Sequence, residues 1–182
     1  MTARGFDDRT GAWTVVETMR RLQKMKLQCA VYGVTTVQEE LGLRGGRTAA
    51  YGIDPHVGIA IDVGFASDYP TIEKKIVGDI SLGKGPVLHR GANINPVLAK
   101  LMESTARKKK IPHQIQAEPR ATGTDANVMQ INRAGAAAAI VSIPNRYMHT
   151  PVEIVCLKDM DNAVNLLAAT LAEIKPSMKF IP

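Results

Sequence analysis

The sequence predicts an α/β fold in which a mainly parallel sheet is flanked by helices on both faces. Short, almost wholly apolar runs have the length of strands that are buried on both sides. They span residues 28–37, 57–63 and 136–143. Segments with apolar residues at helical spacing alternate with them, which favours a covered parallel sheet over a sandwich or a helical bundle.

In the first half of the chain, a helix is predicted at 11–26. Its apolar positions Trp13, Val16, Met19, Leu22 and Met25 recur at helical spacing. The buried strand 28–37 follows it. Residues 41–54 contain four glycines and predict a loop that leads into a short helix.

The second half begins with a Gly- and Pro-rich segment at 67–95, which predicts loops and short edge strands. Helices are expected from Pro96 to Ala106, at 125–134 and at 159–174, and a short strand at 113–118. Thr124 or Asp125 is a plausible N-cap for the middle helix.

Composition narrows the class of protein. The chain has 182 residues, of which 45% are hydrophobic and 22% charged, and this predicts one globular domain over 1–182. The net charge of +6 is dispersed, apart from Arg107 to Lys110 at a predicted helix end, and aromatic residues are only 4%. We therefore expect no nucleic-acid partner.

Neither a membrane span nor a signal peptide is apparent. No apolar run approaches the roughly 20 residues that a bilayer requires, and the first residues lack an apolar stretch. The expectation is a cytoplasmic protein with no membrane partner. Cys29 and Cys156 lie in apolar runs without metal-ligand spacing, so they are expected to be reduced core thiols.

Acidic residues follow the predicted strands, where α/β sheets place their chemistry. Glu39 and Glu40 close the first strand, Asp62 lies near the end of the second, and His149 lies in the loop after the third. The pair Asp7-Asp8 precedes the first helix. Carboxylates and an imidazole suit Zn²⁺, with Co²⁺ or Mn²⁺ possible.

The adjacent glutamates favour a metallohydrolase. On an extended backbone, neighbours point to opposite sides, so one can bind a metal while the other faces the reacting water. The metal would acidify the water, and the free carboxylate would take its proton. Taken singly, each feature has a simpler structural explanation: a solvated Glu-Glu pair, an Asp N-cap pair, a structural histidine.

The combined pattern resembles the tetrahedral aminopeptidases, which are cytosolic dimetal peptidases with some relatives described as endoglucanases or cellulases. The resemblance runs from about residue 3 to 175. It rests on five motifs: Asp7-Asp8-Arg9, Thr36-Val37-Gln38-Glu39-Glu40-Leu41-Gly42, Ala60-Ile61-Asp62-Val63-Gly64, Gly123-Thr124-Asp125-Ala126 and Ile143-Pro144-Asn145-Arg146-Tyr147-Met148-His149-Thr150-Pro151.

The resemblance implies a dimetal aminopeptidase-like fold of the phosphorylase/hydrolase-like type and a role for each residue. Asp7 would bridge two metals and be joined to Asp8 by a cis peptide bond. Glu40 and His149 would complete one metal site, and Asp62 would share the other metal. Glu39 would be the general base and acid. Asp8 and Asp125 would support the ligands or contact substrate.

One part of the family's pattern is absent. The family's first metal-binding histidine lies in a His-x-Asp motif upstream of the Asp-Asp-Arg segment, together with a small β-domain. No such motif occurs here, and His56, His89 and His113 are interpreted as surface or packing residues. The chain thus resembles the C-terminal portion of the catalytic domain, whether as a short protein, a truncated product or a fragment.

The predicted function is a metallo-aminopeptidase acting on peptides. A catalytically impaired homologue that serves as a partner subunit is the alternative, and a two-carboxylate glycosidase using Glu39 and Asp62 is a weaker one. One tightly held ion is expected in place of the family's two. Expected partners are further copies of the chain, or the missing N-terminal half.

Overall fold

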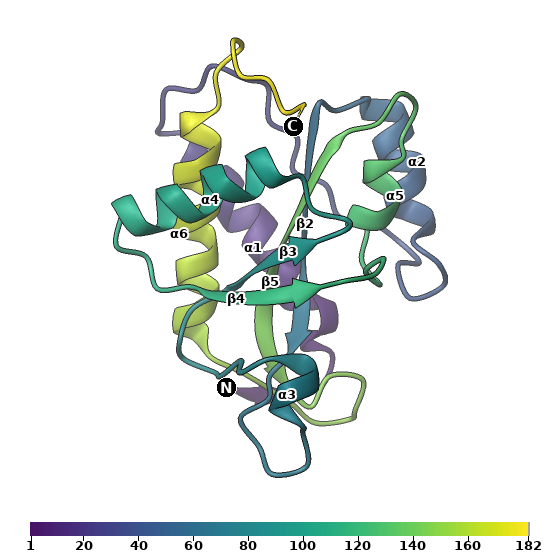
Figure 1. The fold of residues 1–182 in the computed structure, drawn as a ribbon, viewed down its shortest axis with the longest axis vertical. Coiled ribbons are helices and arrows are strands. Elements are labelled where there is room, and N and C mark those ends of the chain that lie inside the picture. Colours follow the sequence, from purple (N-terminus) through teal and green to yellow (C-terminus); the bar gives the residue numbers. More distant parts are fainter. Residues whose placement is uncertain (182) are drawn as a thin grey trace.

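One mixed sheet organises the part of the chain that the computed structural model describes, residues 1–181 (Figure 1). The strands are β1 (Thr2–Ala3), β2 (Val57–Phe65), β3 (Val87–Gly91), β4 (Gln114–Glu118), β5 (Ala137–Arg146) and β6 (Glu153–Val155). The helices are α1 (Phe6–Leu22), α2 (Arg44–Ile53), α3 (Lys74–Val77), α4 (Pro96–Lys108), α5 (Ala126–Gln130) and α6 (Leu157–Glu173). The predicted α/β class is confirmed.

Strand β5 is the centre of the sheet. It pairs along its length with β2 in parallel, from Val57 opposite Ala137 to Phe65 opposite Asn145. On its other side it meets β3 and β6, and the order along that path is β1-β6-β5-β3-β4. The long pairings β2–β5 and β3–β4 are parallel, whereas the three antiparallel pairings cover two residue pairs each.

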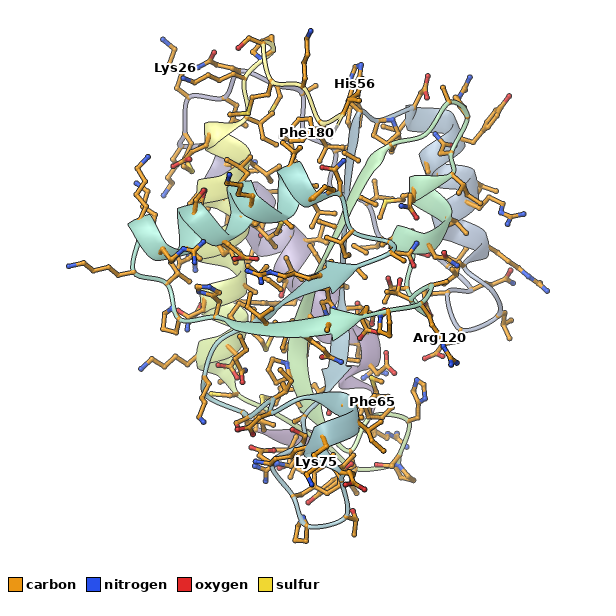
Figure 2. The ribbon with its side chains drawn as sticks, in the orientation of Figure 1. Lys26, His56, Phe65, Lys75, Arg120 and Phe180 are labelled. Atoms are coloured by element: carbon orange, nitrogen blue, oxygen red, sulfur yellow. The ribbon has the colours of Figure 1, made fainter. Side chains whose placement is uncertain are left out.

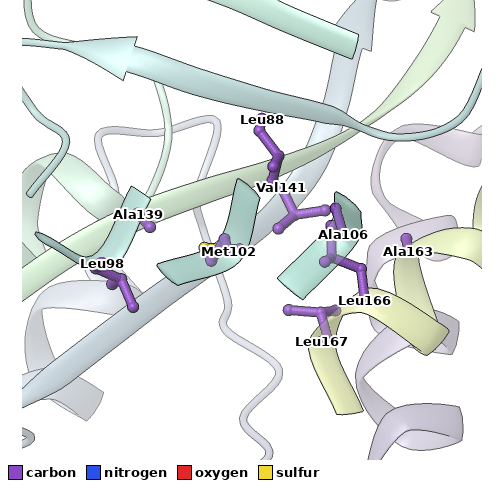
Figure 3. Packing of buried hydrophobic residues seen from close by; sticks show 9 residues of the cluster. All are labelled: Leu88, Leu98, Met102, Ala106, Ala139, Val141, Ala163, Leu166 and Leu167. Atoms are coloured by element: carbon purple, nitrogen blue, oxygen red, sulfur yellow. The ribbon is translucent and has the colours of Figure 1, made fainter. Parts of the chain in front are cut away.

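Alternate residues of β5 build two cores, because successive side chains of a strand point to opposite faces. Ala139 and Val141 pack with α4 and α6, where Leu98 and Leu167 are fully buried (Figure 3). Ala138 and Ile140 pack on the opposite face against α5, which has α2 beside it (Figure 1). Both faces of β5 are covered, as its uniformly apolar sequence predicts.

The predicted buried strand 28–37 is wrong as a strand. These residues form an irregular segment that joins no sheet, and most of its side chains are exposed. Between residues 28 and 36, no backbone–backbone hydrogen bond is present in the described structure. The reason is physical: a strand is stable only when a neighbour accepts and donates its backbone hydrogen bonds.

The buried face of α1 also differs from the predicted apolar stripe. Thr10, Thr14 and Thr18 line it, whereas Trp13 and Val16 are exposed. The hydroxyls of Thr10 and Thr14 donate to the carbonyls of the residues four positions earlier, at 3.0 and 2.8 Å. Satisfied in this way, small side chains allow α1 to approach the sheet closely.

Most of the remaining elements agree with the sequence to within a few residues, but the short strands β1 and β6 were not predicted. The segment 67–95 contains the helix α3 as well as β3, and α5 is shorter than the predicted 125–134. Cys29 and Cys156 are unbridged, as expected, but half-buried rather than in the core. Among residues 1–181, no helix has the length and apolar content needed to cross a membrane.

Candidate metal centre and active site

Three predicted ligands meet although they are far apart in sequence. One side-chain ligand atom from each of Asp7, Glu40 and His149 lies within 4.8 Å of the others. His149 Nε2 is 3.3 Å from Asp7 Oδ2 and 3.7 Å from Glu40 Oε1. Two carboxylates and an imidazole at this spacing fit one divalent cation with open coordination positions.

Local structure positions Asp7 and His149. Asp7 lies at the irregular start of α1, where its N–H donates to the buried carboxylate of Glu153 at 3.0 Å. The loop carrying His149 follows β5 and begins at Arg146, which makes a forked pair with Asp68 at 2.6 and 2.7 Å. His149 itself has a left-handed φ of 64° and contacts the Phe65 ring edge-on.

The peptide bond between Asp7 and Asp8 is cis, as the resemblance implied, and so is the bond between Arg146 and Tyr147. Asp8 also fulfils the simpler prediction of a helix cap, because its Oδ1 accepts the Gly11 N–H at 2.9 Å.

Glu39 and Glu40 occupy different environments, although the backbone between them is a turn rather than the extended strand that was expected. The N–H groups of Gly42 and Leu43 both donate to the Glu39 carbonyl, at 3.0 and 2.8 Å. Glu40 is exposed, whereas Glu39 is half-buried and its Oε1 has no hydrogen-bond partner among the described residues. The turn, rather than an extended strand, therefore places the side chains of Glu39 and Glu40 in different surroundings.

Asp62 and Asp8 lie beside the three-residue cluster. Asp62 Oδ1 accepts the Val63 N–H at 2.8 Å, and the two carboxylates are close enough to repel each other. Burial and this repulsion raise the pKa of Asp8 to about 8. Burial, with the charges of Glu39 and Asp7, raises the pKa of Asp62 to about 7.

Asp125 is held at the far side of the site. It stands at the N-cap position of α5, but its carboxylate accepts the Thr36 hydroxyl at 2.7 Å rather than capping the helix. Its Oδ1 is buried without a partner in the described structure. A Cβ at Gly46 of α2 would lie 2.2 Å from this oxygen, so glycine there makes room for the carboxylate.

The site has an excess of negative charge. Burial and the neighbouring carboxylate of Glu40 raise the pKa of Asp7 to about 6, and burial with Glu40 and Asp125 raises that of Glu39 to about 7. Carboxylates that repel one another in a partly dehydrated site favour a bound cation. The donor set therefore fits the metal that the sequence predicted.

Sequence reasoning missed Thr36 and Glu153, which hold Asp125 and the backbone of Asp7. For Glu153 the available signal in the sequence was an acid within the apolar run from Val152 to Val155. The other histidines stay outside the site: His89 is buried against Ser142, His113 contacts the Ile111 carbonyl and His56 is exposed. This agrees with their interpretation as packing or surface residues.

Known proteins resemble this chain in sequence and in fold. The chain is 50% identical over 177 residues to the lysyl aminopeptidase of Pyrococcus furiosus. The matched region covers 97% of this chain and 49% of the relative. It superposes on the TET aminopeptidase of Thaumarchaeota archaeon SCGC AB-539-E09 with a TM-score of 0.88 at 34% identity, over 96% of this chain and 50% of that one. A TET1 peptidase of Pyrococcus horikoshii gives 0.81 at 32% identity, over 95% and 50%.

The chain spans about half the length of the relatives it matches. Over residues 1–166 the sequence matches the family described as M42 glutamyl aminopeptidase, and this range contains the three candidate metal ligands Asp7, Glu40 and His149. The chain belongs to the M42 glutamyl aminopeptidase family.

Proposed function

We propose that this chain carries the C-terminal portion of the active site of a metal-dependent aminopeptidase, which removes N-terminal residues from peptides. The observation that carries the proposal is the convergence of Asp7, Glu40 and His149 from three distant segments. Membership of a peptidase family and the relative's lysyl aminopeptidase name support the reaction class.

Each residue has a chemical task in this proposal. Asp7, Glu40 and His149 would hold one zinc ion, with cobalt or manganese as possible substitutes, and Asp62 with Asp7 would hold a second one more weakly. A bound cation would supply Lewis acidity toward the peptide carbonyl and acidify a water. Asp8 and Asp125 would orient the ligands or the substrate.

Glu39 would move the proton. It is half-buried, it lies outside the three-ligand cluster, and one of its oxygens is free of other hydrogen bonds in the described structure. A raised pKa near 7 suits a group that takes a proton from water and then returns it to the leaving amine.

A peptidase assay tests the proposal. The chain, alone and mixed with the N-terminal half of the Pyrococcus furiosus relative, is supplied with Zn²⁺ or Co²⁺ and lysine p-nitroanilide. Release of p-nitroaniline should depend on metal and stop with a chelator. The matched substrate with an acetylated amino group should not react, because an aminopeptidase needs a free N-terminus.

Two outcomes would replace the proposal. Absence of metal-dependent release in both preparations would favour a catalytically impaired partner subunit. Hydrolysis of a cellulose oligomer that persists in chelator would favour a glycosidase that uses Glu39 and Asp62.

We also propose that 1–182 acts as a single portion of the catalytic domain, and that the active form is a homo-oligomer. The Pyrococcus horikoshii TET1 peptidase assembles into a tetrahedron or a large octahedral shell, and the present chain has the same fold over the matched region. Light scattering at increasing protein concentration measures the assembly.

A further inference from the structure

The position of His149 depends on contacts between its loop and other segments. Its side chain is 59% exposed, and its ring meets the Phe65 ring edge-on, with the ring centroids 6.2 Å apart. Its φ of 64° lies in the left-handed region, which costs free energy for a residue with a Cβ and persists only where surrounding contacts hold it. The loop by itself would therefore not keep this candidate ligand in place.

The segment 65–69, at the carboxyl end of β2, provides such contacts. Phe65 is opposite Asn145 in the parallel pairing of β2 with β5, and the Ala66 N–H donates to the Asn145 carbonyl at 3.0 Å. His56, which precedes β2, lies at the other end of the molecule from Phe65 (Figure 2). The residues that follow β2 and β5 are therefore neighbours at one edge of the sheet.

Two further contacts join this segment to the loop of His149. The rings of Tyr69 and Tyr147 meet edge-on, with their centroids 5.0 Å apart. Beside them, Arg146 Nε and Nη2 donate to the two oxygens of Asp68, at 2.7 and 2.6 Å. Forked hydrogen bonds between a guanidinium and a carboxylate are charge-assisted and fix direction as well as distance. They also lower the pKa of Asp68, so its carboxylate stays charged at neutral pH.

Asp68 is also held by the body of the protein. Its Oδ2 accepts the Leu82 N–H at 3.0 Å. The preceding residue, Ser67, is fully buried, and its N–H donates to the Ile80 carbonyl at 2.7 Å while its hydroxyl oxygen accepts the Ile80 N–H at 2.8 Å. Asp68 is therefore a fixed point, to which the forked pair ties the start of the histidine loop.

We propose that Asp68 and Arg146 are positioning residues, which hold the loop of His149 in place before a metal ion binds. The proposal rests on the proposed function, because it takes His149 to be a metal ligand. Without the forked pair, metal binding would also have to order the loop, and this cost would lower the affinity. Groups that orient a ligand without touching the metal typically change metal affinity by about 10–100-fold.

Hydrogen exchange in the metal-free full chain tests the positioning directly. Asp68→Asn keeps the shape of the side chain and removes its charge, so exchange in residues 146–152 should become faster by about tenfold or more. Glu103→Gln is the matched control, because Glu103 of α4 accepts a similar fork from Arg90 at 2.7 and 2.6 Å. It should leave exchange in 146–152 unchanged.

Calorimetric titration of the same proteins with Zn²⁺ measures the consequence for the site. Asp68→Asn and Arg146→Lys should each weaken binding by about 10–100-fold, since lysine keeps the charge but cannot form the fork. The double variant should bind no more weakly than either single one, because both changes remove the same interaction. Glu103→Gln should bind like the unaltered chain. Circular dichroism checks folding, and Arg146→Lys decides the matter if Asp68→Asn is unfolded.

The ligand itself provides a sharper control. If Asp68 acts on the metal only through His149, then Asp68→Asn should not weaken Zn²⁺ binding any further in a His149→Ala chain. A general loss of stability would weaken binding in both backgrounds.

Three results would overturn the proposal: unchanged exchange in 146–152 of Asp68→Asn; an equal loss of affinity in Glu103→Gln; and a loss of affinity from Asp68→Asn that persists in the His149→Ala chain. Failure of the unaltered chain to bind Zn²⁺ would contradict the metal site of the proposed function instead. Exchange in the metal-free chain would then decide by itself whether the pair holds the loop, so the two proposals fail separately.

Discussion

At the scale of single residues, Glu39 and Glu40 are adjacent in sequence but have different surroundings. Glu40 is exposed beside Asp7 and His149, whereas Glu39 is half-buried with an oxygen lacking a partner in the described chain. The turn at 38–42 produces this difference, and Gln38 enters it with a left-handed φ of 57°. Side-chain amides at these two positions should therefore have different consequences.

The first prediction compares Glu39→Gln with Glu40→Gln. Each change keeps the size of the side chain and removes its charge. Glu39→Gln should lower any peptidase turnover by about 10²–10⁴ while metal content stays the same, since it removes the base. Glu40→Gln should lower metal content, since a neutral amide is a poor ligand. Elemental analysis and kinetics measure both, and the reverse pattern would exchange the two assignments.

The second prediction concerns His89, which is buried with Nε2 2.9 Å from Ser142 Oγ. Burial lowers its pKa from 6.5 to about 4. Because the unfolded chain then binds the proton more readily, the stability that neutral His89 contributes is full above pH 6.5 and is lost as the pH falls toward 4. The loss amounts to at most about 3 kcal/mol.

Urea unfolding at pH 7 and pH 4.5 measures this effect. His89→Gln should reduce the difference in free energy of unfolding between the two pH values, whereas the exposed control His56→Gln should leave it as it is. An unchanged difference in His89→Gln would mean that the imidazole is not the group responsible.

At the scale of elements, helix α2 contains two glycines whose surroundings differ. Gly46 faces the Asp125 carboxylate, whereas no atom lies within 4 Å of a Cβ at Gly52. One helix thus offers a crowded and an open glycine. Gly46 links α2 to the N-terminus of α5, and so to the site.

The third prediction is that Gly46→Ala and Gly52→Ala change stability in opposite directions. Gly52→Ala should raise the free energy of unfolding by up to about 1 kcal/mol, because alanine has the better helix propensity. Gly46→Ala should lower it by about 1–3 kcal/mol, since the added methyl overpacks the contact with Asp125. Denaturant titrations compare them, and equal gains would show that Asp125 moves aside without cost.

Over the whole molecule, the charge of the site affects folding. The pKa values of Asp7, Glu39, Asp62 and Asp8 are raised to about 6, 7, 7 and 8, while such groups titrate near 4 in an unfolded chain. Without a cation, these four groups therefore bind more protons in the folded chain than in the unfolded chain between pH 4 and 8. The stability that they contribute is highest below this window and is lost as the pH rises through it.

The fourth prediction follows from the way the charge on these carboxyl groups changes with pH. Zn²⁺ at micromolar concentration should raise the melting temperature more at pH 7.5 than at pH 5, because protons compete with the metal for the carboxylates. His149→Ala should remove most of the shift. After dialysis, at most about one ion per chain should remain, since only three of the described residues form a close ligand set. Two tightly held ions would contradict the prediction that the second metal site binds more weakly than the first.

The fifth prediction is that the chain in isolation associates with itself or is weakly stable. The open edge of β2, the unpaired segment 28–36 and exposed side chains such as Trp13 and Tyr32 present apolar surface and free backbone groups. Sizing chromatography should show oligomers or aggregates. A monomer that withstands heating would show that these surfaces are tolerated without a partner.

Local patterns in the sequence were sufficient to predict most helices and the strands β2 and β5, and to select candidate residues for the site. Periodicity reports which face of an element is buried, and acidic residues after apolar runs mark the carboxyl ends of strands. The family motifs added the convergence of Asp7, Glu40 and His149, which no spacing along the chain reveals.

The remaining features depend on contacts between distant segments. Segment 28–37 has the sequence of a buried strand but lacks a neighbouring strand in the described structure, and α1 buries threonines while Trp13 is exposed. A sequence pattern states what an element could bury or pair with, whereas hydrogen bonds and packing require a partner that is present in space. For this reason the sequence was enough to predict an α/β metallopeptidase portion. The folded chain alone revealed that, within the described residues, β2 has an open edge and segment 28–36 is unpaired.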